Sequence, residues 1–399
     1  MTPFARNAVV LGLLSAVGPF AIDMYLPALP AIAADLHTTT ASTQMTLTVF
    51  FIAFGLCQIV YGPLSDVYGR KAPLYAGLTL FTIGSIGCAL APGIGWLIAF
   101  RFVQGLGAAA MAVIPRAIIR DLHTGAEATR LMSLVMLVFS VCPILAPLIG
   151  SALIVPFGWR AVFAAVTLAA LIGIALVALM LPETRPIEER IGGSMRNVLG
   201  GFRILLRDGH FLGLTFIGGL GMSSFFAFLA TSSFVYIGHY GLSPTQYSLA
   251  FSINAIGFIG ASQFAGYLGG RFGMTRVVLT AVSLYAGFAL LLFALTLMGF
   301  DSLRVLMPLL FMSFAFLGLV IPSTMVLALE HHGPIAGIAA ALGGTLQMVT
   351  GGVMIAVAGL FFDGTTLPMV CTIALTAVAA LLVSLATLRN TRLVTAAAE

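Results

Sequence analysis

The sequence predicts an all-α membrane protein with twelve transmembrane helices in two pseudo-symmetric halves of six. Of its 399 residues, 60% are hydrophobic and only 8% are charged, whereas a soluble domain carries about a quarter charged residues. Apolar stretches of about 20 residues, the length that crosses a bilayer, recur along the chain. In addition, a motif from the first half repeats in the second half. These observations exclude a soluble globular protein.

Charged residues and Pro/Gly clusters divide the apolar sequence into twelve expected spans. They cover residues 6–30, 43–65, 73–91, 95–119, 129–154, 159–181, 210–237, 245–269, 276–298, 303–328, 334–361 and 367–388. The first run is too long for a secretory signal peptide and lacks a clear small-residue cleavage site. The longest polar interruption predicts a six-helix bundle of residues 1–181, a cytoplasmic linker of residues 182–209 and a second bundle of residues 210–399.

The distribution of Arg and Lys predicts that both chain ends lie in the cytoplasm. An even number of spans places both termini on one side, and that side holds fourteen of the eighteen basic residues. Because cytoplasmic loops carry the excess of positive charge, we expect a multi-pass membrane protein with both termini in the cytoplasm. This topology accounts for the isoelectric point near 9.2 without a nucleic-acid partner.

The linker contains an amphipathic segment between Arg196 and Arg207. Val198, Phe202 and Leu205 fall on one helical face and the arginines on another. Such a segment suits the headgroup layer, where it would contact anionic membrane lipid. A solvated tether between two bundles is the alternative.

An internal repeat supports the division into two halves. The stretch "GPLSDVYGRK" at 62–71 follows the second span, and "GYLGGRFGMT" at 266–275 follows the eighth. At a constant offset of 204 residues, Gly62 matches Gly266 and Gly69 matches Gly273. Parallel repeats of six spans, with a site at their interface, occur in secondary transporters.

The first copy of this repeat carries charges as well as glycines. Asp66 is suited to accept hydrogen bonds from a helix N-terminus or to pair with an arginine. The stretch resembles the signature between the second and third helices of the major facilitator superfamily, and the resemblance implies a conformational latch between the halves. Asp66 would then cap the start of the eleventh span, near residues 333–336. The implied latch residues are Gly62, Asp66, Gly69, Arg70 and Arg120.

Two charges lie inside the spans of the first half at similar depth. Asp23, within "AIDMYLPALP", is the single charge between Asn7 and Pro30, and Arg101 opens the fourth span in "RFVQGLGAAA". Each lies about 10 Å from the same membrane face. A charge at this depth is costly and usually faces a partner or a cavity, so we expect Asp23 and Arg101 to pair directly or through water. Burial disfavours the ionised carboxylate and a guanidinium favours it, which brings proton binding within reach of physiological pH. A purely structural salt bridge is the alternative.

Further stretches resemble the Bcr/CflA-type drug:proton antiporters of the same superfamily. These are "DMYLPALP" in the first helix, "RAIIRDL" at the end of the fourth and "AGIAAALGGTLQ" in the eleventh. By this resemblance Asp23 is the proton-coupling residue and Arg101 its modulator. The cargo implied is a drug-like small molecule, of multidrug or phenicol type.

Two helices carry packing motifs typical of this superfamily. Gly105 in the fourth span, followed by small residues, allows a close helix contact. Pro143, Pro147 and Gly150 in the fifth span resemble the antiporter motif of exporters, although Ala146 stands where that motif has a glycine. The export direction is inferred from this resemblance.

An aromatic and sparsely polar substrate cavity is expected, although many of its aromatic candidates would equally suit contact with lipid. The candidates are Tyr25, Phe225, Phe226, Tyr236, Asn254 and Gln263. We expect no metal site, because the adjacent His331 and His332 point to different faces of a helix.

Together these features predict a monomer that exports drug-like small molecules by alternating access. The proton gradient supplies the energy, and no cofactor is expected. Export or symport of a small metabolite, such as an amino acid or short peptide, is the alternative. An enzyme is disfavoured because the spans lack a nucleophile with a base or a metal cluster. A channel is disfavoured by the two-fold repeat with its latch.

Overall fold

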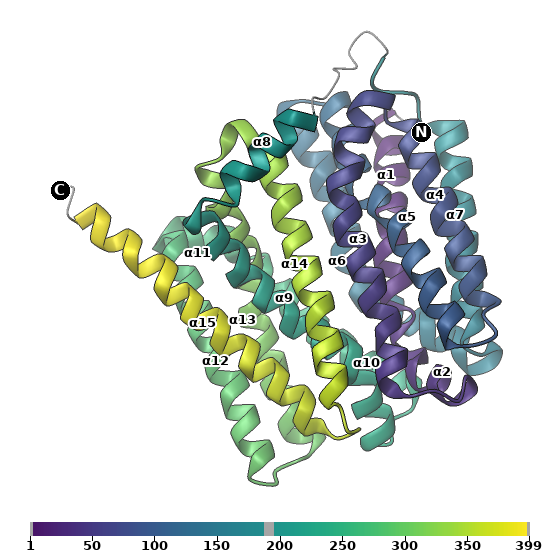
Figure 1. Ribbon diagram of the computed structural model, residues 1–399, viewed down its shortest axis with the longest axis vertical. Coiled ribbons are helices and arrows are strands. Elements are labelled where there is room, and N and C mark those ends of the chain that lie inside the picture. Colours follow the sequence, from purple (N-terminus) through teal and green to yellow (C-terminus); the bar gives the residue numbers. More distant parts are fainter. Residues whose placement is uncertain (1–2, 187–194, 397–399) are drawn as a thin grey trace. The chain divides into compact units, whose positions relative to one another are not determined.

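The structure, a computed structural model, describes residues 3–186 and 195–396, and these residues form helices and contain no strand. Twelve segments are long and apolar enough to cross a membrane, which confirms the predicted number of spans. The chain divides into two compact units (Figure 1). The first comprises Met1–Met195 with Ser243–Leu249, and the second Arg196–Leu242 with Ala250–Glu399.

The first unit is a bundle of long helices that lie side by side (Figure 1). Its elements are α1 (Pro3–Asp23), the 3-10 turn η1 (Leu26–Ala28), α2 (Leu29–Asp35), α3 (Thr40–Tyr68), α4 (Lys71–Ala89), α5 (Ile94–Leu122), α6 (Gly125–Phe157) and α7 (Arg160–Met180). Glycines bring α4 and α5 together, since a Cβ on Gly84 would lie only 2.6 Å from the backbone nitrogen of Gln104. Small residues therefore set the closest helix contacts, as is usual in membrane bundles.

The first expected span is not one continuous helix, contrary to the sequence prediction. α1 ends at Asp23, and the chain resumes as η1 and α2. Pro27 explains the break, because a proline lacks an N–H group and its ring clashes with the carbonyl four residues earlier, here that of Asp23. The backbone tightens just before it, where the Tyr25 N–H donates to the Ile22 carbonyl at 3.2 Å. A discontinuous span thus carries Asp23 at its break.

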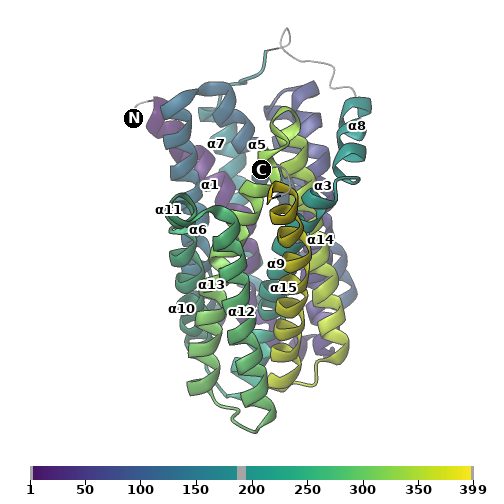
Figure 2. The same cartoon turned by 90° about the vertical axis from the view of Figure 1, so that its left-hand side faces the viewer.

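The second unit is likewise built from long helices, of which α12, α13 and α15 lie side by side in Figure 2. Its elements are α8 (Met195–Leu205), α9 (Gly209–Ser233), the π-helical segment η3 (Phe234–His239), α10 (Pro244–Ser262), α11 (Ala265–Phe272), α12 (Met274–Leu297), α13 (Leu303–Glu330), the 3-10 turn η4 (Gly333–Ile335), α14 (Ala336–Phe361) and α15 (Thr366–Ala396). The first turns of α10 belong to the first unit.

Asp208 sets the start of α9. Its carboxylate accepts hydrogen bonds from the backbone N–H groups of His210 at 2.8 Å and Phe211 at 3.2 Å, and lies 2.9 Å from His332 Nε2. Burial alone would raise the pKa of Asp208, but these hydrogen bonds outweigh it and lower that pKa. Just before it, α8 packs through Gly201 against Ile338 of α14. The side chains of Arg196 and Val198 lie outside the described residues.

The internal repeat appears as the same backbone turn in both units. Gly69 ends α3 with φ +85°, and Gly273 ends α11 with φ +85°. Glycine adopts this left-handed conformation without a steric cost. After the first turn, Arg70 Nη1 donates to Ser65 Oγ at 2.7 Å. After the second, the Met274 sulfur covers Gly269, 2.8 Å from where a Cβ would lie.

Candidate functional site

Asp23 lies buried at the break of the first span, with 6% of its surface exposed. As the last residue of α1, it lies where unpaired carbonyl groups carry partial negative charge, which disfavours a second negative charge. No ion pair or hydrogen bond joins its carboxylate to another residue in the described part of the chain. Burial without a partner favours the protonated form of this group.

Helix α6 packs closely against the break in the first span. A Cβ added at Gly150 would clash with the Met24 carbonyl oxygen, so only glycine lets α6 approach this closely. Cys142 of the same helix lies within electrostatic range of Asp23. Pro143 and Pro147 lie between these positions, inside a helix that continues from Gly125 to Phe157. The predicted packing motif thus supports the backbone that carries Asp23.

Arg101 is fully buried on α5, with none of its surface exposed. Its Nη1 donates to Gln104 Oε1 at 2.5 Å and to the Ala21 carbonyl at 3.3 Å. Its guanidinium carbon lies 4.7 Å from the Tyr25 ring centroid and 4.3 Å from that of Phe50. Cation–π contacts of this kind are worth up to about 2 kcal/mol when desolvated. Two aromatic rings therefore offset part of the cost of burying this charge.

The hydrogen bonds around Arg101 are incomplete. Its Nε and Nη2 atoms have no hydrogen-bond partner among the described residues. Gln104 continues the network by donating to Ser85 Oγ at 2.7 Å. A buried guanidinium with unused N–H groups is suited to bind an anion or a carboxylate.

The structure does not join Asp23 and Arg101 directly in this conformation, and their pairing through water stays a prediction. Within the described residues, no oxygen of Asp23 lies within 4.0 Å of an Arg101 nitrogen. Depth alone suggested the pairing, and the two residues do approach the same part of α1. Arg101, however, bonds to the backbone of Ala21 instead of the carboxylate two residues later.

At the turn between α3 and α4, the side chain of Arg70 joins two other segments. The residue is buried, and its side chain binds Asp66 through Nη1 at 2.7 Å and Asp121 through Nε at 2.7 Å and Nη2 at 3.1 Å. Burial would lower the pKa of Arg70, but hydrogen bonds to the two carboxylates outweigh it and raise that pKa. This cluster fixes the end of α5 against the turn between α3 and α4.

The segment after α7 completes the same cluster. The Glu183 carboxylate accepts the backbone N–H groups of Arg70 at 2.8 Å and Lys71 at 3.1 Å, which caps the start of α4. Arg185 Nη1 lies 3.0 Å from Asp66 Oδ1. The chain that leaves the first bundle is therefore held by the charges of the repeat motif.

The remaining predicted latch contacts do not occur in this cluster. Arg120 is exposed and does not join this cluster; its neighbour Asp121 provides the contact instead. Gly62 lies inside α3 with no atom within 4 Å of a Cβ built there. The expected contact of Asp66 with residues 333–336 would link the two units and remains a prediction.

In the second unit, Met307 of α13 lies between two of the predicted cavity residues. The Tyr236 hydroxyl donates to its sulfur at 3.2 Å, and Asn254 Nδ2 lies 3.8 Å from the same atom. Asn254 is 1% exposed, and its Oδ1 has no hydrogen-bond partner among the described residues. Tyr236 belongs to η3, and π-helical segments often occur at functional sites.

Aromatic rings surround this polar group. Phe228 contacts Tyr236, Phe251 and Phe314, with ring centroids 6.3, 5.6 and 5.0 Å apart. Phe225 extends the cluster through Phe314, at 5.8 Å. The result is a largely buried aromatic cluster, called the aromatic wall below, that contains one amide and one phenol.

The remaining cavity candidates lie elsewhere. Tyr25 belongs to the Arg101 site, where its hydroxyl bonds to Thr46 Oγ1 at 2.8 Å. Phe226 packs tightly on Gly351 of α14. Gln263 is exposed at the turn between α10 and α11 and bonds to Ser262 and the Ile259 carbonyl. The aromatic candidates thus separate into a cluster around Tyr236 and residues that fill helix contacts.

Sequence reasoning missed Asp121, Glu183 and Met307. A signal existed for the first two: "RDL" ends a span next to the predicted latch, and "PETR" begins the linker on the same side. Met307 gave no signal, because the sequence does not show which of many methionines contacts a buried amide. No group of three metal-ligating side chains occurs in the described ranges.

The fold and these sites define a class of protein: a multi-pass membrane transporter built from two repeated helical bundles, with an acid at a helix break. The chain belongs to the Major Facilitator Superfamily, whose family model matches residues 11–356. The predicted resemblance to this superfamily is thereby confirmed. Its members are transporters, so the chain is a transporter and not an enzyme.

Individual relatives agree with this assignment. The chain is 36% identical to the uncharacterized MFS-type transporter YdgK of Bacillus subtilis, covering 93% of this chain and 92% of that protein. It is 32% identical to a bicyclomycin resistance protein homolog of Haemophilus influenzae, covering 91% of each. It is 30% identical to multidrug resistance protein D of Escherichia coli, covering 87% and 86%.

A solved structure supports the fold. A bacterial homolog of the human lysosomal transporter Spinster, inward-facing and unoccupied, matches with a TM-score of 0.76 over 98% of both chains. The sequences are only 14% identical, so this likeness concerns the fold alone. The all-α fold with twelve spans is thereby confirmed.

Proposed function

We propose that this chain exports uncharged or weakly polar, drug-like molecules in exchange for protons, by alternating access of its two halves. The observation that carries the proposal is the buried, unpaired Asp23 carboxylate at the break of the first span. The names of two relatives, a bicyclomycin resistance protein homolog and multidrug resistance protein D, support drug-like cargo.

Proton coupling uses Asp23 and Arg101 in turn. In the described conformation Asp23 has no cationic partner, which suits its neutral, protonated form. Loss of the proton leaves a buried anion at Asp23. The unused N–H groups of Arg101 are the hydrogen-bond donors that would stabilise it. The non-helical residues after Asp23 give the end of α1 the freedom to move toward Arg101. Deprotonation is thus tied to a rearrangement of the first span.

The cargo contacts the aromatic wall of the second unit. In the described spans of that unit, the charged side chains lie near helix ends, at Arg271, Arg276, Arg304 and Glu330. A wall without charge favours a neutral molecule. The free Asn254 Oδ1 accepts a hydrogen bond from a cargo hydroxyl or amide, and Tyr236 can exchange the weak Met307 sulfur for a better acceptor.

The Arg70 cluster acts as the latch at the end that carries the N-terminus. Its contacts join the repeat motif, the end of α5 and the start of the linker. The excess of basic residues on this side supports a cytoplasmic location for both termini, in the bacterial inner membrane. As the two halves close and open, the contacts around this cluster form and break. The transporter acts as a monomer.

Proteoliposomes containing the intact chain test this function. Addition of a cargo such as a phenicol should release protons from the wild type, and Asp23→Asn should abolish that release while cargo binding persists. Asp35→Asn is the matched control, because Asp35 ends the same broken span but is half-exposed and paired with Arg160 at 2.8 Å. Proton release by Asp23→Asn equal to the wild type would reject the role of Asp23.

The choice of cargo is tested in cells that lack their own pumps. Resistance to several drugs on expression supports drug export, whereas altered release of an amino acid or peptide without resistance supports the metabolite alternative. Asn254→Leu should reduce export of hydroxyl- or amide-bearing drugs about tenfold, because a hydrogen bond is lost. Gln263→Leu is the control and should leave export unchanged; an equal loss in both would contradict the proposed wall.

A further inference from the structure

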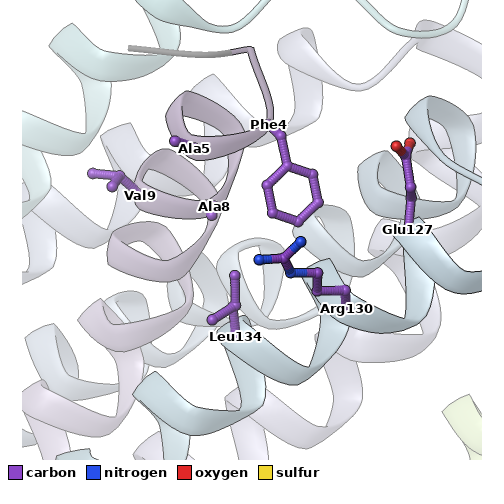
Figure 3. A pocket seen from close by; sticks show the side chains of 7 residues that line it. All are labelled: Phe4, Ala5, Ala8, Val9, Glu127, Arg130 and Leu134. Atoms are coloured by element: carbon purple, nitrogen blue, oxygen red, sulfur yellow. The ribbon is translucent and has the colours of Figure 1, made fainter.

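A pocket of about 670 Å³ lies in the first unit between the first turns of α1 and of α6 (Figure 3). It takes no part in the proposed proton coupling. Its lining combines one cation, one carboxylate, one aromatic ring and small or aliphatic side chains. The residues are Phe4, Ala5, Ala8, Val9, Glu127, Arg130 and Leu134.

The cation in this pocket has no acidic partner. The Arg130 guanidinium carbon lies 5.4 Å from the Phe4 ring centroid, and no ion pair within 4.0 Å joins Arg130 to any residue that the structure describes. Glu127 instead lies 3.0 Å from His123 Nδ1. Figure 3 shows the Arg130 guanidinium between Phe4 and Leu134, with the Glu127 carboxylate pointing away from it. The pocket therefore presents a free positive charge to a ligand.

An apolar surface leads from this charge along both helices. Val9 and Leu13 are exposed on one face of α1, and Leu134 and Leu137 on one face of α6, because side chains three or four residues apart lie together on a helix. The two helices touch near the base of the pocket, where a Cβ on Gly12 would lie 3.3 Å from Val138 Cγ2. These exposed side chains form an open apolar groove that a linear acyl chain would follow toward the membrane interior.

We propose that this pocket binds an anionic phospholipid, with its phosphate on Arg130 and one acyl chain along the groove. Arginine is suited to phosphate because its N–H groups form two parallel hydrogen bonds. Basic pockets between transmembrane helices commonly hold anionic headgroups. A free phosphate would leave the apolar groove unused, and a cationic molecule would be repelled by Arg130. The lipid therefore links the start of the first span to the start of α6. Further along the same helix, α6 supports the backbone next to Asp23.

Binding of a fluorescent phosphatidylglycerol to the intact purified chain tests the proposal. Arg130→Gln should weaken binding about fivefold, the effect of one arginine at a membrane surface. Arg120→Gln is the matched control, since Arg120 is exposed at the same end of the unit without lining the pocket. Equal effects of the two substitutions would overturn the proposal, because binding would then reflect general surface charge.

Two further measurements separate the lipid from other ligands. Ala8→Phe fills the pocket without changing its charge and should reduce phosphatidylglycerol binding at least as much as Arg130→Gln. Unchanged binding in this variant would overturn the proposed groove. Phosphatidylcholine should bind more weakly than phosphatidylglycerol to the wild type, and inorganic phosphate should compete only weakly. Full displacement by millimolar phosphate would indicate a free-anion site and reject the lipid. Thermal unfolding of each variant verifies that it is folded.

Discussion

Substitution of Asp121 offers a direct measure of what the Arg70 cluster contributes. In Asp121→Asn, a buried arginine loses a two-point contact made by Nε at 2.7 Å and Nη2 at 3.1 Å. Breaking one partner of a buried pair costs roughly 3–5 kcal/mol. Asp66 still binds Arg70, and 18% of the Asp121 side chain is exposed. We therefore expect a smaller loss of about 2 kcal/mol in the first unit.

A thermal assay with a dye that fluoresces on reaction with thiols measures this loss. Cys88 and Cys142 are buried in the first unit and become reactive when it unfolds. Replacement of Cys57 and Cys371 by Ser removes the two half-buried thiols. For a unit of this size, 2 kcal/mol corresponds to a fall in Tm of about 4–8 °C.

Asp66→Asn is the matched comparison for this experiment. It also removes one carboxylate from Arg70, but 44% of the Asp66 side chain is exposed. An exposed pair contributes at most about 1 kcal/mol, so its Tm should fall by no more than about half as much. A fall for Asp66→Asn as large as that for Asp121→Asn would refute the argument from burial.

Three further changes follow from the geometry. Gly69→Ala should destabilise the first unit by about 1–2 kcal/mol because the φ of Gly69 is positive. Gly62→Ala should have a smaller effect, because the gain in helix propensity is offset by crowding against the following Pro63. Dye-based unfolding compares the two variants, and equal effects would contradict the turn geometry. Gly150→Val should reduce transport by forcing α6 away from the break in α1, and wild-type exchange would count against that contact. Burial favours a higher pKa for Asp301, but its hydrogen bonds to Tyr240 and others outweigh this and lower that pKa. The stabilisation by Asp301 is complete above pH about 4 and disappears as the pH falls through the lowered pKa, so the Tm difference between wild type and Asp301→Asn should shrink in acid; a constant difference would exclude this linkage.

The sequence predicted the twelve spans and the repeat because bilayer thickness imposes a length on every helix. The turn at Gly69 was also readable, since few residues other than glycine adopt a positive φ. The break after Asp23 was readable as well, from Pro27, but a long apolar run was interpreted as one helix. The sequence pattern and the local backbone rules were therefore sufficient to predict the features that depend on the backbone alone.

Side-chain partners were not predictable to the same degree. Similar depth suggested that Asp23 and Arg101 pair, but depth does not fix the direction in which each helix face points. Arg120 and Asp121 are neighbours in sequence and point differently, so only one reaches Arg70. Which aromatic residues meet Asn254 depends on helix rotation, which one sequence does not determine.

The two matching turns differ in what lies over them, and this difference sets how each unit responds to its surroundings. Arg70 covers Ser65 with a charge, whereas Met274 covers Gly269 with a thioether at the equivalent position. Ionic strength has little effect on the first contact because Arg70 is buried. The half-buried Met274 thioether, in contrast, is open to an oxidant that converts methionine to its sulfoxide. The duplicated turn is therefore held by a buried charge in one unit and covered by an oxidisable thioether in the other, so an oxidant should affect the second unit first.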